Sequence, residues 1–279
     1  MGKKRVKDIH VINKVIPHLY PRRTDAEVFV LEKLDITELL KYLADKNKKL
    51  PEDKKITLFH ALMTAAAKMI YHRPSLNRFI KQRKTYQRDE ITIAFVSRRE
   101  FKDESDELVI QIKIDDKDNI ESIRDKIVGN VSKARKDNNG VDTLMKVVTS
   151  LPMPLTAFVA KLFKLADNHL MILPKSFTES VPDFASLFVA NLGSIKGGAA
   201  YHHLNNFGTN SLFATIGTAH QEEVITNGKK QIRDIIEVGI TIDERISDGF
   251  RAFRAFSLLK DIIANPKLLD ETIDSGVEK

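Results

Sequence analysis

The charged residues between positions 243 and 249 have types and spacing that could perform chemistry. They read Asp243-Glu244-Arg245-Ile246-Ser247-Asp248-Gly249. Glu244 is a candidate acid or base, because a carboxylate within reach of a substrate can exchange a proton with it. Asp248 is placed to cap a helix that begins beside Gly249. This run therefore predicts a turn that carries three acids and one arginine between a strand and a helix.

A strand must lead into this turn and a helix must leave it. Ile232, Ile236, Val238, Ile240 and Ile242 fall on one face at period two, which predicts a half-buried strand. After Gly249 the apolar spacing becomes three and four, which predicts a helix that ends at Asn265-Pro266. Asn227-Gly228 is a strong hairpin signal just before the strand.

The composition indicates one globular domain with a real core. The chain has 279 residues, of which 42% are hydrophobic, and it has no cysteine. Disulfides, thiolate metal sites and cysteine nucleophiles are thereby excluded, and a reducing, cytoplasmic location is expected. No stretch has the roughly 18 to 20 apolar residues of a spanning helix. Nucleic acid is not an expected partner, because 38 acidic residues are interspersed with the basic ones and no nucleic-acid motif accompanies the net charge of +7.

The turn resembles the catalytic motif of the acyltransferase core of 2-oxoacid dehydrogenase complexes (dihydrolipoamide acyltransferase) and of chloramphenicol acetyltransferase, His-x-x-x-Asp-Gly. Asp248 and Gly249 match this motif, and Glu244 stands where the family has histidine. Other stretches resemble the family in the same order along the chain. They are Asn191-Leu192-Gly193, Gly208-Thr209, Phe213 to Gly217 and Asn265 to Leu269, and the resemblance covers roughly Pro17 to Leu269.

The resemblance implies an α/β fold, the chloramphenicol acetyltransferase-like two-layer sandwich, in which helices cover a mixed sheet. It implies an acyltransferase-type protein that binds coenzyme A or an acyl thioester as substrate, with no covalently bound cofactor and no metal. It also implies a homotrimer with each active site between two subunits, and it leaves a larger cage open. The domain is expected over residues 17–269, between a basic N-terminal arm (1–16) and a polar C-terminal tail (270–279).

Two departures from the family bear on the mechanism. The family's histidine takes a proton from a thiol, and an unperturbed glutamate is a weaker base by about two pKa units. Glu244 would therefore need burial against apolar walls to act in its place. The family's hydroxyl donor to the oxyanion is replaced by Ala190, whose methyl group cannot donate. The alternative is thus a catalytically inactive family member that acts as a trimeric binding or scaffold protein.

Other residues take roles by analogy with the family. The pair His202-His203 lies between two strands that frame the family's site, so either histidine is a candidate replacement base, a substrate contact or a structural residue. Asn191, Gly193 and Ser194 are candidate substrate-binding residues. The family braces its catalytic loop with an aspartate–arginine pair, which predicts an ion pair from Asp248 to Arg22 or Arg23.

Three further segments carry expectations of their own. The apolar segment 151–174 is expected to be an amphipathic helix that covers the core or lines a substrate channel, with membrane docking as the alternative. The basic cluster from Lys81 to Arg88 is expected to be a solvated loop. The apolar run from Leu58 to His72, preceded by Thr57 as an N-cap, predicts a helix that is buried on most sides.

Overall fold

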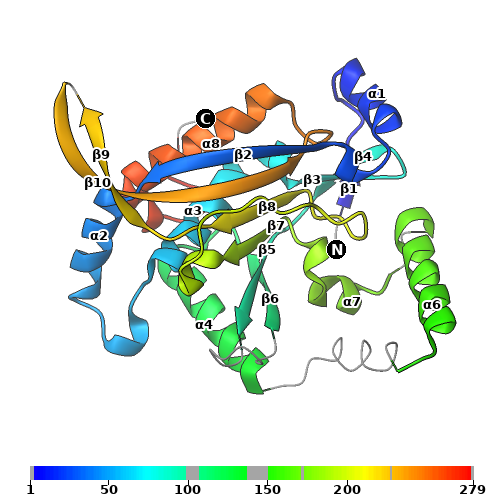
Figure 1. The fold of residues 1–279 in the computed structure, drawn as a ribbon, viewed down its shortest axis with the longest axis horizontal. Helices are drawn as coiled ribbons and strands as arrows, with labels where there is room; N and C mark the ends of the chain where they lie inside the picture. The colour runs from blue at the N-terminus through cyan, green and yellow to red at the C-terminus, as the bar shows by residue number, and fades with distance from the viewer. Residues whose placement is uncertain (1–2, 99–106, 137–149, 171–172, 227, 278–279) are drawn as a thin grey trace.

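The computed structural model describes residues 3–98, 107–136, 150–170, 173–226 and 228–277, and its centre is a seven-stranded mixed sheet (Figure 1). The strand order is β2-β10-β8-β7-β5-β6, and β9 pairs with β10 outside this path. β7 runs parallel to β5 and β8, and the other neighbours are antiparallel. The strands are β2 (Glu27–Asp35), β5 (Ile91–Arg98), β6 (Glu107–Ile114), β7 (Leu187–Asn191), β8 (Leu212–Ile216), β9 (His220–Thr226) and β10 (Lys229–Asp243).

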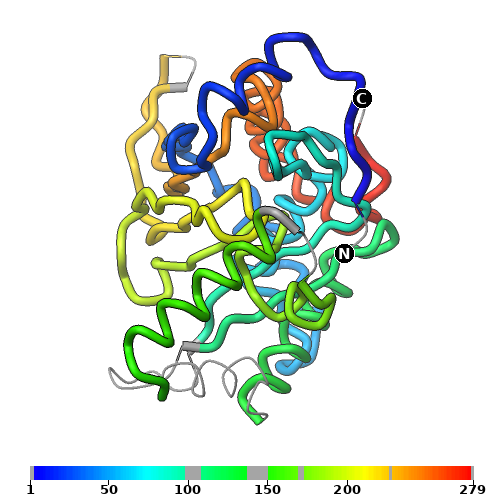
Figure 2. Tube along the Cα trace, turned by 90° about the vertical axis from the view of Figure 1, so that its right-hand side faces the viewer, coloured from blue at the N-terminus to red at the C-terminus, as the bar shows by residue number. Residues whose placement is uncertain are grey.

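Helices pack against one face of this sheet, so the predicted mixed sheet covered by helices is confirmed (Figures 1 and 2). They are α2 (Thr37–Asn47), α3 (Leu58–His72), α4 (Ile120–Lys136) and α8 (Gly249–Ala264). α3 lies between α8 and α4 and also contacts β5. Its predicted burial is confirmed, since ten of its residues are buried, and Thr57 caps its N-terminus through a hydrogen bond from the backbone N–H of His60.

β10 is the long strand that the alternating apolar residues predict, and it ends at the expected turn. The side chains of Ile236, Val238, Ile240 and Ile242 are buried in the core. Ile232 has the same alternation but is exposed, because at this position β10 pairs only with β9 in the hairpin that projects from the sheet (Figure 1). The hairpin between β9 and β10 is confirmed, although Asn227 itself lies outside the described residues.

The N-terminal region is more ordered than the expected basic arm. β1 (Lys3–Arg5) pairs with β4 (Lys84–Arg88), which pairs with β3 (Arg78–Lys81) in a separate small sheet. Helix α1 (Val11–Leu19) follows. The solvated loop expected around Lys81 and Arg88 is wrong for these two residues, since both side chains are buried.

The sequence predicts a polar tail that starts at Asp270, whereas the packed chain continues beyond this residue. Ile273 is fully buried and its backbone N–H donates to the carbonyl of Asp118. The ammonium group of Lys68, a buried residue of α3, donates to the carbonyl oxygens of Leu268 (2.8 Å) and Thr272 (2.9 Å). The segment is ordered because a buried charge needs these acceptors.

The segment predicted as an amphipathic helix forms α6 (Met153–Leu165), followed by the short α7 (Lys175–Ser180). α6 does not cover the core, because none of its residues is buried. Figure 1 shows it at the edge of the molecule, away from the large sheet. In the described parts of the chain, no helix has the length and apolarity needed to cross a membrane.

Candidate active site

The turn that carries Glu244 joins the end of β10 to the start of α8. Its backbone is fixed, because the N–H of Glu244 donates to the carbonyl of Ala26 at 2.9 Å and that of Ile246 donates to Asp243 at 3.1 Å. The side chain of Glu244 is exposed. Among the described residues its carboxylate has no hydrogen bond or ion pair. The burial that would make Glu244 a stronger base is therefore absent within a single chain.

The carboxylate that holds this turn is Asp243, and the predicted ion pair from Asp248 to Arg22 or Arg23 is wrong. Asp243 is fully buried and accepts two hydrogen bonds of 2.7 Å from the guanidinium of Arg245. Arg23 is buried on its other side, with Nε 3.7 Å from the Asp243 carboxylate. Burial lowers the pKa of Arg23, and Asp243 opposes this shift.

Asp248 and Arg22 have other partners for a simple geometric reason. Asp248 is exposed at the start of α8, where its carboxylate caps the helix by accepting from the N–H of Arg251 at 2.9 Å. Arg22 is exposed and pairs with Asp25 at 3.1 Å. The helix-cap alternative for Asp248 is what the structure shows, since Asp243 occupies the buried position beside β2.

A groove with a volume of about 570 Å³ lies at the end of β5 and β7 and contains several of the predicted site residues. Ala190, Asn191, Ser194 and His202 line it together. Among the described residues, the remaining lining is apolar except for Ser97, and none of those that line the groove is charged. These other residues are Phe59, Phe95, Val96, Val109, Ile127, Val131, Pro182, Phe188, Leu192, Ile195 and Phe213.

His202 is held in one orientation inside this groove. Its ring stacks on Phe213, with the ring centres 4.1 Å apart and the planes only 6° from parallel. Its Nδ1 lies 2.7 Å from the backbone carbonyl oxygen of His203. A carbonyl oxygen only accepts, so Nδ1 must carry a proton. In the neutral ring Nε2 is then unprotonated, which is the state that a general base requires.

His203 is exposed, as His202 is, but it is not among the described residues that line the groove. Its ring stacks against that of His202, with the ring centres 4.7 Å apart. The next residue, Leu204, donates its backbone N–H to the carboxylate of Glu27 at the start of β2. The loop that carries both histidines is therefore anchored to the same end of β2 as the turn of Glu244.

The three candidate substrate-binding residues separate into two kinds. Asn191 lines the groove, and within the described residues its side-chain amide makes no hydrogen bond. Ser194 also lines the groove, but its hydroxyl donates to the carbonyl of Asn191 at 2.7 Å. Gly193 is required for packing, because a Cβ atom there would lie 2.4 Å from the backbone oxygen of Gly217. Asn191 is thus the one whose side chain is available to a ligand.

The register of the sheet separates Glu244 from Ala190 within one chain. Ala190 pairs with Thr215, and Thr215 pairs with Gly239. Glu244 lies five residues further along β10, or about 17 Å at the rise of an extended strand. A site that contains both residues therefore needs Glu244 from a second copy of the chain.

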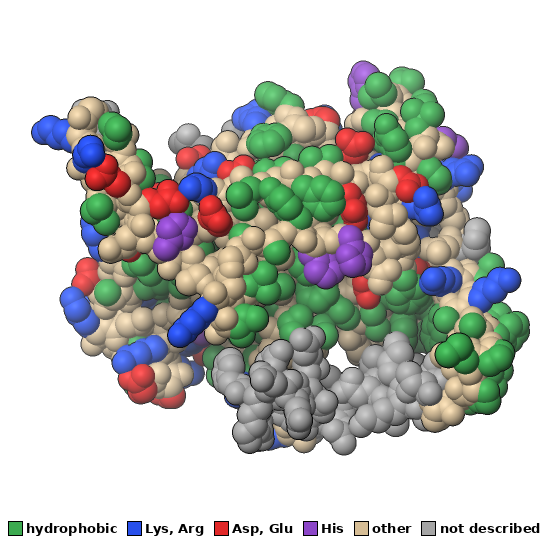
Figure 3. Space-filling view, viewed as in Figure 1, with side chains coloured by type: hydrophobic (Ala, Val, Ile, Leu, Met, Phe, Trp, Pro, Cys, Tyr) green, Lys and Arg blue, Asp and Glu red, His purple; other side chains and the backbone are tan. Residues whose placement is uncertain are grey.

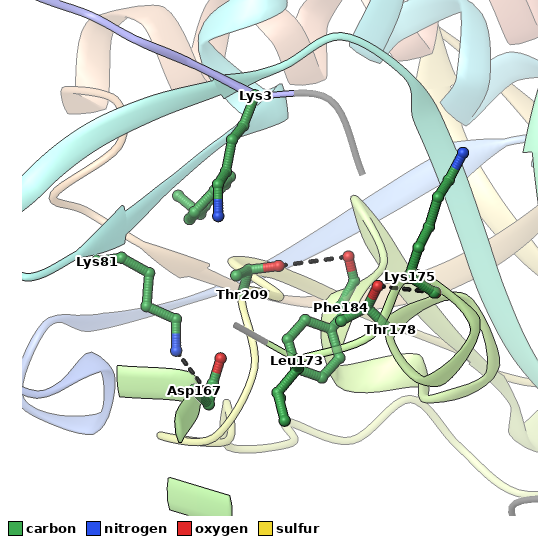
Figure 4. A pocket seen from close by; sticks show the side chains of 9 residues that line it. Lys3, Lys81, Asp167, Leu173, Lys175, Thr178, Phe184 and Thr209 are labelled. Carbon is green, nitrogen blue, oxygen red and sulfur yellow. Dashed lines mark hydrogen bonds and ion pairs between the residues drawn. The ribbon is translucent and has the colours of Figure 1, made fainter. Parts of the chain in front are cut away.

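A second cavity, of about 260 Å³, lies beside the small sheet and was not anticipated from the sequence. Figure 4 shows Lys81 and Asp167 pointing toward one another there, and they form a buried ion pair. Burial lowers the pKa of Lys81 to about 8, while Asp167 opposes the shift. Asp167 also accepts from the backbone N–H of Gly208 at 2.8 Å, so the pair holds the loop that follows the histidines.

The described residues include no group of three or more His, Cys, Asp or Glu side chains that could hold a metal ion. His202 and His203 are engaged with Phe213 and with each other instead.

Comparisons with known proteins bear on the fold of the chain. The family profile of the 2-oxoacid dehydrogenases acyltransferase (catalytic domain) matches residues 182–270, which is less than half of the chain. No curated protein matches the sequence. Among solved structures, a probable dihydrolipoamide acetyltransferase from Listeria monocytogenes 4b F2365 is 18% identical, with 94% of this chain and 95% of that chain covered and a TM-score of 0.62.

Two other structures extend the comparison. The cubic core of a pyruvate dehydrogenase multienzyme complex is also 18% identical, with 95% of this chain and 93% of that chain covered and a TM-score of 0.62. A chloramphenicol acetyltransferase is 10% identical, with coverages of 94% and 100% and a TM-score of 0.57. The chain has the chloramphenicol acetyltransferase-like fold.

The part of this chloramphenicol acetyltransferase-like chain that matches the acyltransferase profile contributes one wall of the groove, and the other wall, from Phe59 to Val131, lies outside the match. Residues 182–270 include the strand end at Ala190, the loop with His202 and the turn with Glu244. The N-terminal residue Arg23 lies outside the match but is bound to this part through Asn206, whose side-chain oxygen accepts from its backbone N–H at 2.8 Å.

Proposed function

We propose that the protein is an acyltransferase-type homotrimer that binds coenzyme A or an acyl thioester in the groove lined by Ala190, Asn191 and His202. The observation that carries this proposal is the orientation of His202. Its Nδ1 proton is committed to the carbonyl of His203, so Nε2 is free to take a proton in the groove. The absence of cysteine supports a cytoplasmic location.

In this proposal, Nε2 of His202 removes a proton from the thiol of the acceptor, and the resulting thiolate attacks the acyl carbonyl. The bond from the carbonyl carbon to the sulfur of coenzyme A then breaks, and the leaving thiolate takes the proton back from His202. The apolar walls of the groove accommodate the uncharged part of the thioester, and Asn191 supplies an amide donor near the carbonyl. Ala190 contributes no donor, so the reaction is slower than one with a hydroxyl at this position by on the order of 100-fold.

The trimer is proposed because an apolar patch lies exposed beside the groove. Phe29 and Leu31 of β2 are each close to half exposed, and the ring of Phe29 lies 5.5 Å from that of the exposed Tyr201. Figure 3 shows apolar side chains along this strand, directly above a pair of histidines. A second copy on this patch would bring its Glu244 toward the groove and bury apolar surface that a monomer leaves in water.

A catalytically inactive binding or scaffold protein is the second candidate, and Ala190 and Glu244 favour it. The first supplies no oxyanion donor, and the second is exposed and has no hydrogen bond or ion pair with any of the described residues. Such a protein would retain the trimer and the groove but not transfer an acyl group.

The deciding experiment compares His202→Gln with His203→Gln. The purified proteins are incubated with acetyl-CoA and a panel of thiol and alcohol acceptors while free thiol is measured, and coenzyme A binding is measured by calorimetry. We expect His202→Gln to lose at least 100-fold in rate with little change in binding. His203→Gln retains the backbone carbonyl that orients His202 and should keep most of the rate.

Three other results would change the conclusion. Equal rates for His202→Gln and the parent, together with a loss of rate in Glu244→Gln, would assign the base to Glu244. Coenzyme A binding without any transfer would favour the scaffold. No binding by any of the variants would refute the acyltransferase proposal.

A further inference from the structure

Two helices at one end of the molecule expose apolar faces that nothing in the described chain covers. Both α1 and α6 lie at the right-hand end of Figure 1, which Figure 2 views directly. Figure 3 shows apolar side chains on both helices, with basic side chains between them. This end is distinct from the apolar patch on β2 and from the groove, so it needs its own explanation.

α6 has more apolar surface than it packs against the rest of the described chain. Its inner side is held by Phe163, whose ring stacks on Phe177 of α7 at 5.5 Å. A second stripe at spacings of three and four residues points into solvent. It consists of Leu155 (45% exposed), Phe158 (56%), Leu162 (47%) and Leu165 (47%).

α1 repeats this arrangement. Its buried residue is Pro17, and four apolar residues on the other side are exposed. They are Val11 (70%), Ile12 (59%), Val15 (47%) and Leu19 (66%). A monomeric protein rarely leaves two such stripes in water unless they bind something.

The charges around both stripes identify the partner. Between residues 150 and 166 there are two lysines, Lys161 and Lys164, and no acidic residue. Both lysines are exposed and lie beside the stripe of α6. Between residues 3 and 19 there are five lysines and arginines, all of them exposed, and one acid, Asp8. An apolar face bordered by lysines is the arrangement of helices that lie in the interface of a bilayer, where the lysine stems extend toward the headgroups.

We propose that α1 and α6 together dock this end of the protein onto an anionic lipid bilayer. The apolar stripes enter the boundary between headgroups and acyl chains, and the basic residues contact lipid phosphates. A second copy of the chain is less suitable as the occupant, because it would present the same basic residues to one another. Neither helix spans the bilayer, and the groove with His202 stays outside it.

The test is flotation of the full-length protein with vesicles of phosphatidylcholine alone or of phosphatidylcholine mixed with phosphatidylserine. We expect binding to the mixed vesicles that weakens as salt is raised, and much weaker binding to the neutral ones. The double variant Phe158→Asp with Leu162→Asp should reduce the partition coefficient by at least tenfold, because both side chains would otherwise enter the apolar region. Lys161→Glu with Lys164→Glu should also reduce it by at least tenfold, since each basic residue near an anionic surface contributes about fivefold.

The matched control is Ile225→Asp, which changes an even more exposed apolar residue in the β9–β10 hairpin at the opposite end of the molecule. It should bind the mixed vesicles like the parent, and all variants should melt like the parent because none of these side chains is buried. The proposal is refuted if the parent does not float with the mixed vesicles, or if the α6 variants float as well as Ile225→Asp. If the α6 variants instead change the mass of the particle in solution, the stripe contacts a second copy and the proposal is wrong.

Discussion

Replacing Asp243 by asparagine tests whether this residue, rather than Asp248, holds the catalytic turn. Asp243 is fully buried between two buried arginines, with two contacts of 2.7 Å to Arg245 and one of 3.7 Å to Arg23. Asparagine keeps the size of the side chain and removes the negative charge. Two buried guanidinium groups would then lose the carboxylate that lies between them.

The expected loss of stability follows from that geometry. Breaking a buried ion pair by removing one partner costs about 3 to 5 kcal/mol, because the remaining charge stays desolvated. In a chain of this length such a loss lowers the melting temperature by roughly 5 to 15 °C. The guanidinium of Arg245 also keeps its bonds to the carbonyls of Tyr20 (2.9 Å) and Pro21 (3.1 Å), which places the variant toward the lower end of the range.

Asp248→Asn is the matched control, five residues away in the same turn. Asparagine caps a helix nearly as well as aspartate, and the exposed pair with Arg251 contributes little. We expect a loss below about 1 kcal/mol. Both variants are compared by urea denaturation at one pH and by differential scanning calorimetry. If Asp243→Asn and Asp248→Asn lie within 1 kcal/mol of each other, the assignment of the buried carboxylate is wrong.

Three further outcomes are expected. Burial lowers the pKa of His60 to about 4. Between about pH 6.5 and 4 the unfolded chain therefore binds a proton at this residue that the folded chain does not. The free energy of unfolding should fall by on the order of 2 kcal/mol as the pH is lowered through this window. His60→Gln should flatten this fall in denaturation curves while keeping the cap with Thr57. Gly193→Ala should cost about 1 to 3 kcal/mol in urea denaturation, whereas Gly129→Ala, which has open space in α4, should be neutral or stabilising. Mass photometry should find a trimer, and a monomer at micromolar concentration would exclude a site shared between two chains.

The elements that the sequence predicted well are those whose signals are local. The alternation along β10, the apolar run of α3 and the Asn227-Gly228 hairpin each depend on neighbouring residues, and all three have the predicted type. The fold class follows from these elements together with the motif order, and it is confirmed.

The partners of charged side chains were not predictable in this way. Asp243 and Asp248 are five residues apart in the same turn, and only the pairing of β10 with β2 buries the first of them. Arg23 is held by residues about 183 positions away. Lys81 and Arg88 lie in a basic run that resembles a surface loop, while their partners are in distant segments. The tautomer of His202 depends on the direction of one carbonyl group, which no residue pattern encodes.

The position of β2 at the edge of the sheet has a consequence for synthesis of the chain. Among the strands that the structure describes, its one neighbour is β10, whose pairing residues run from Ile235 to Asp243. When β2 leaves the ribosome, about 200 residues must still be made before this neighbour exists, which takes roughly 10 to 40 s at typical rates of elongation. During that time the apolar residues of β2 have no sheet to join, so folding of the large sheet is completed after synthesis of the last long strand rather than in step with it.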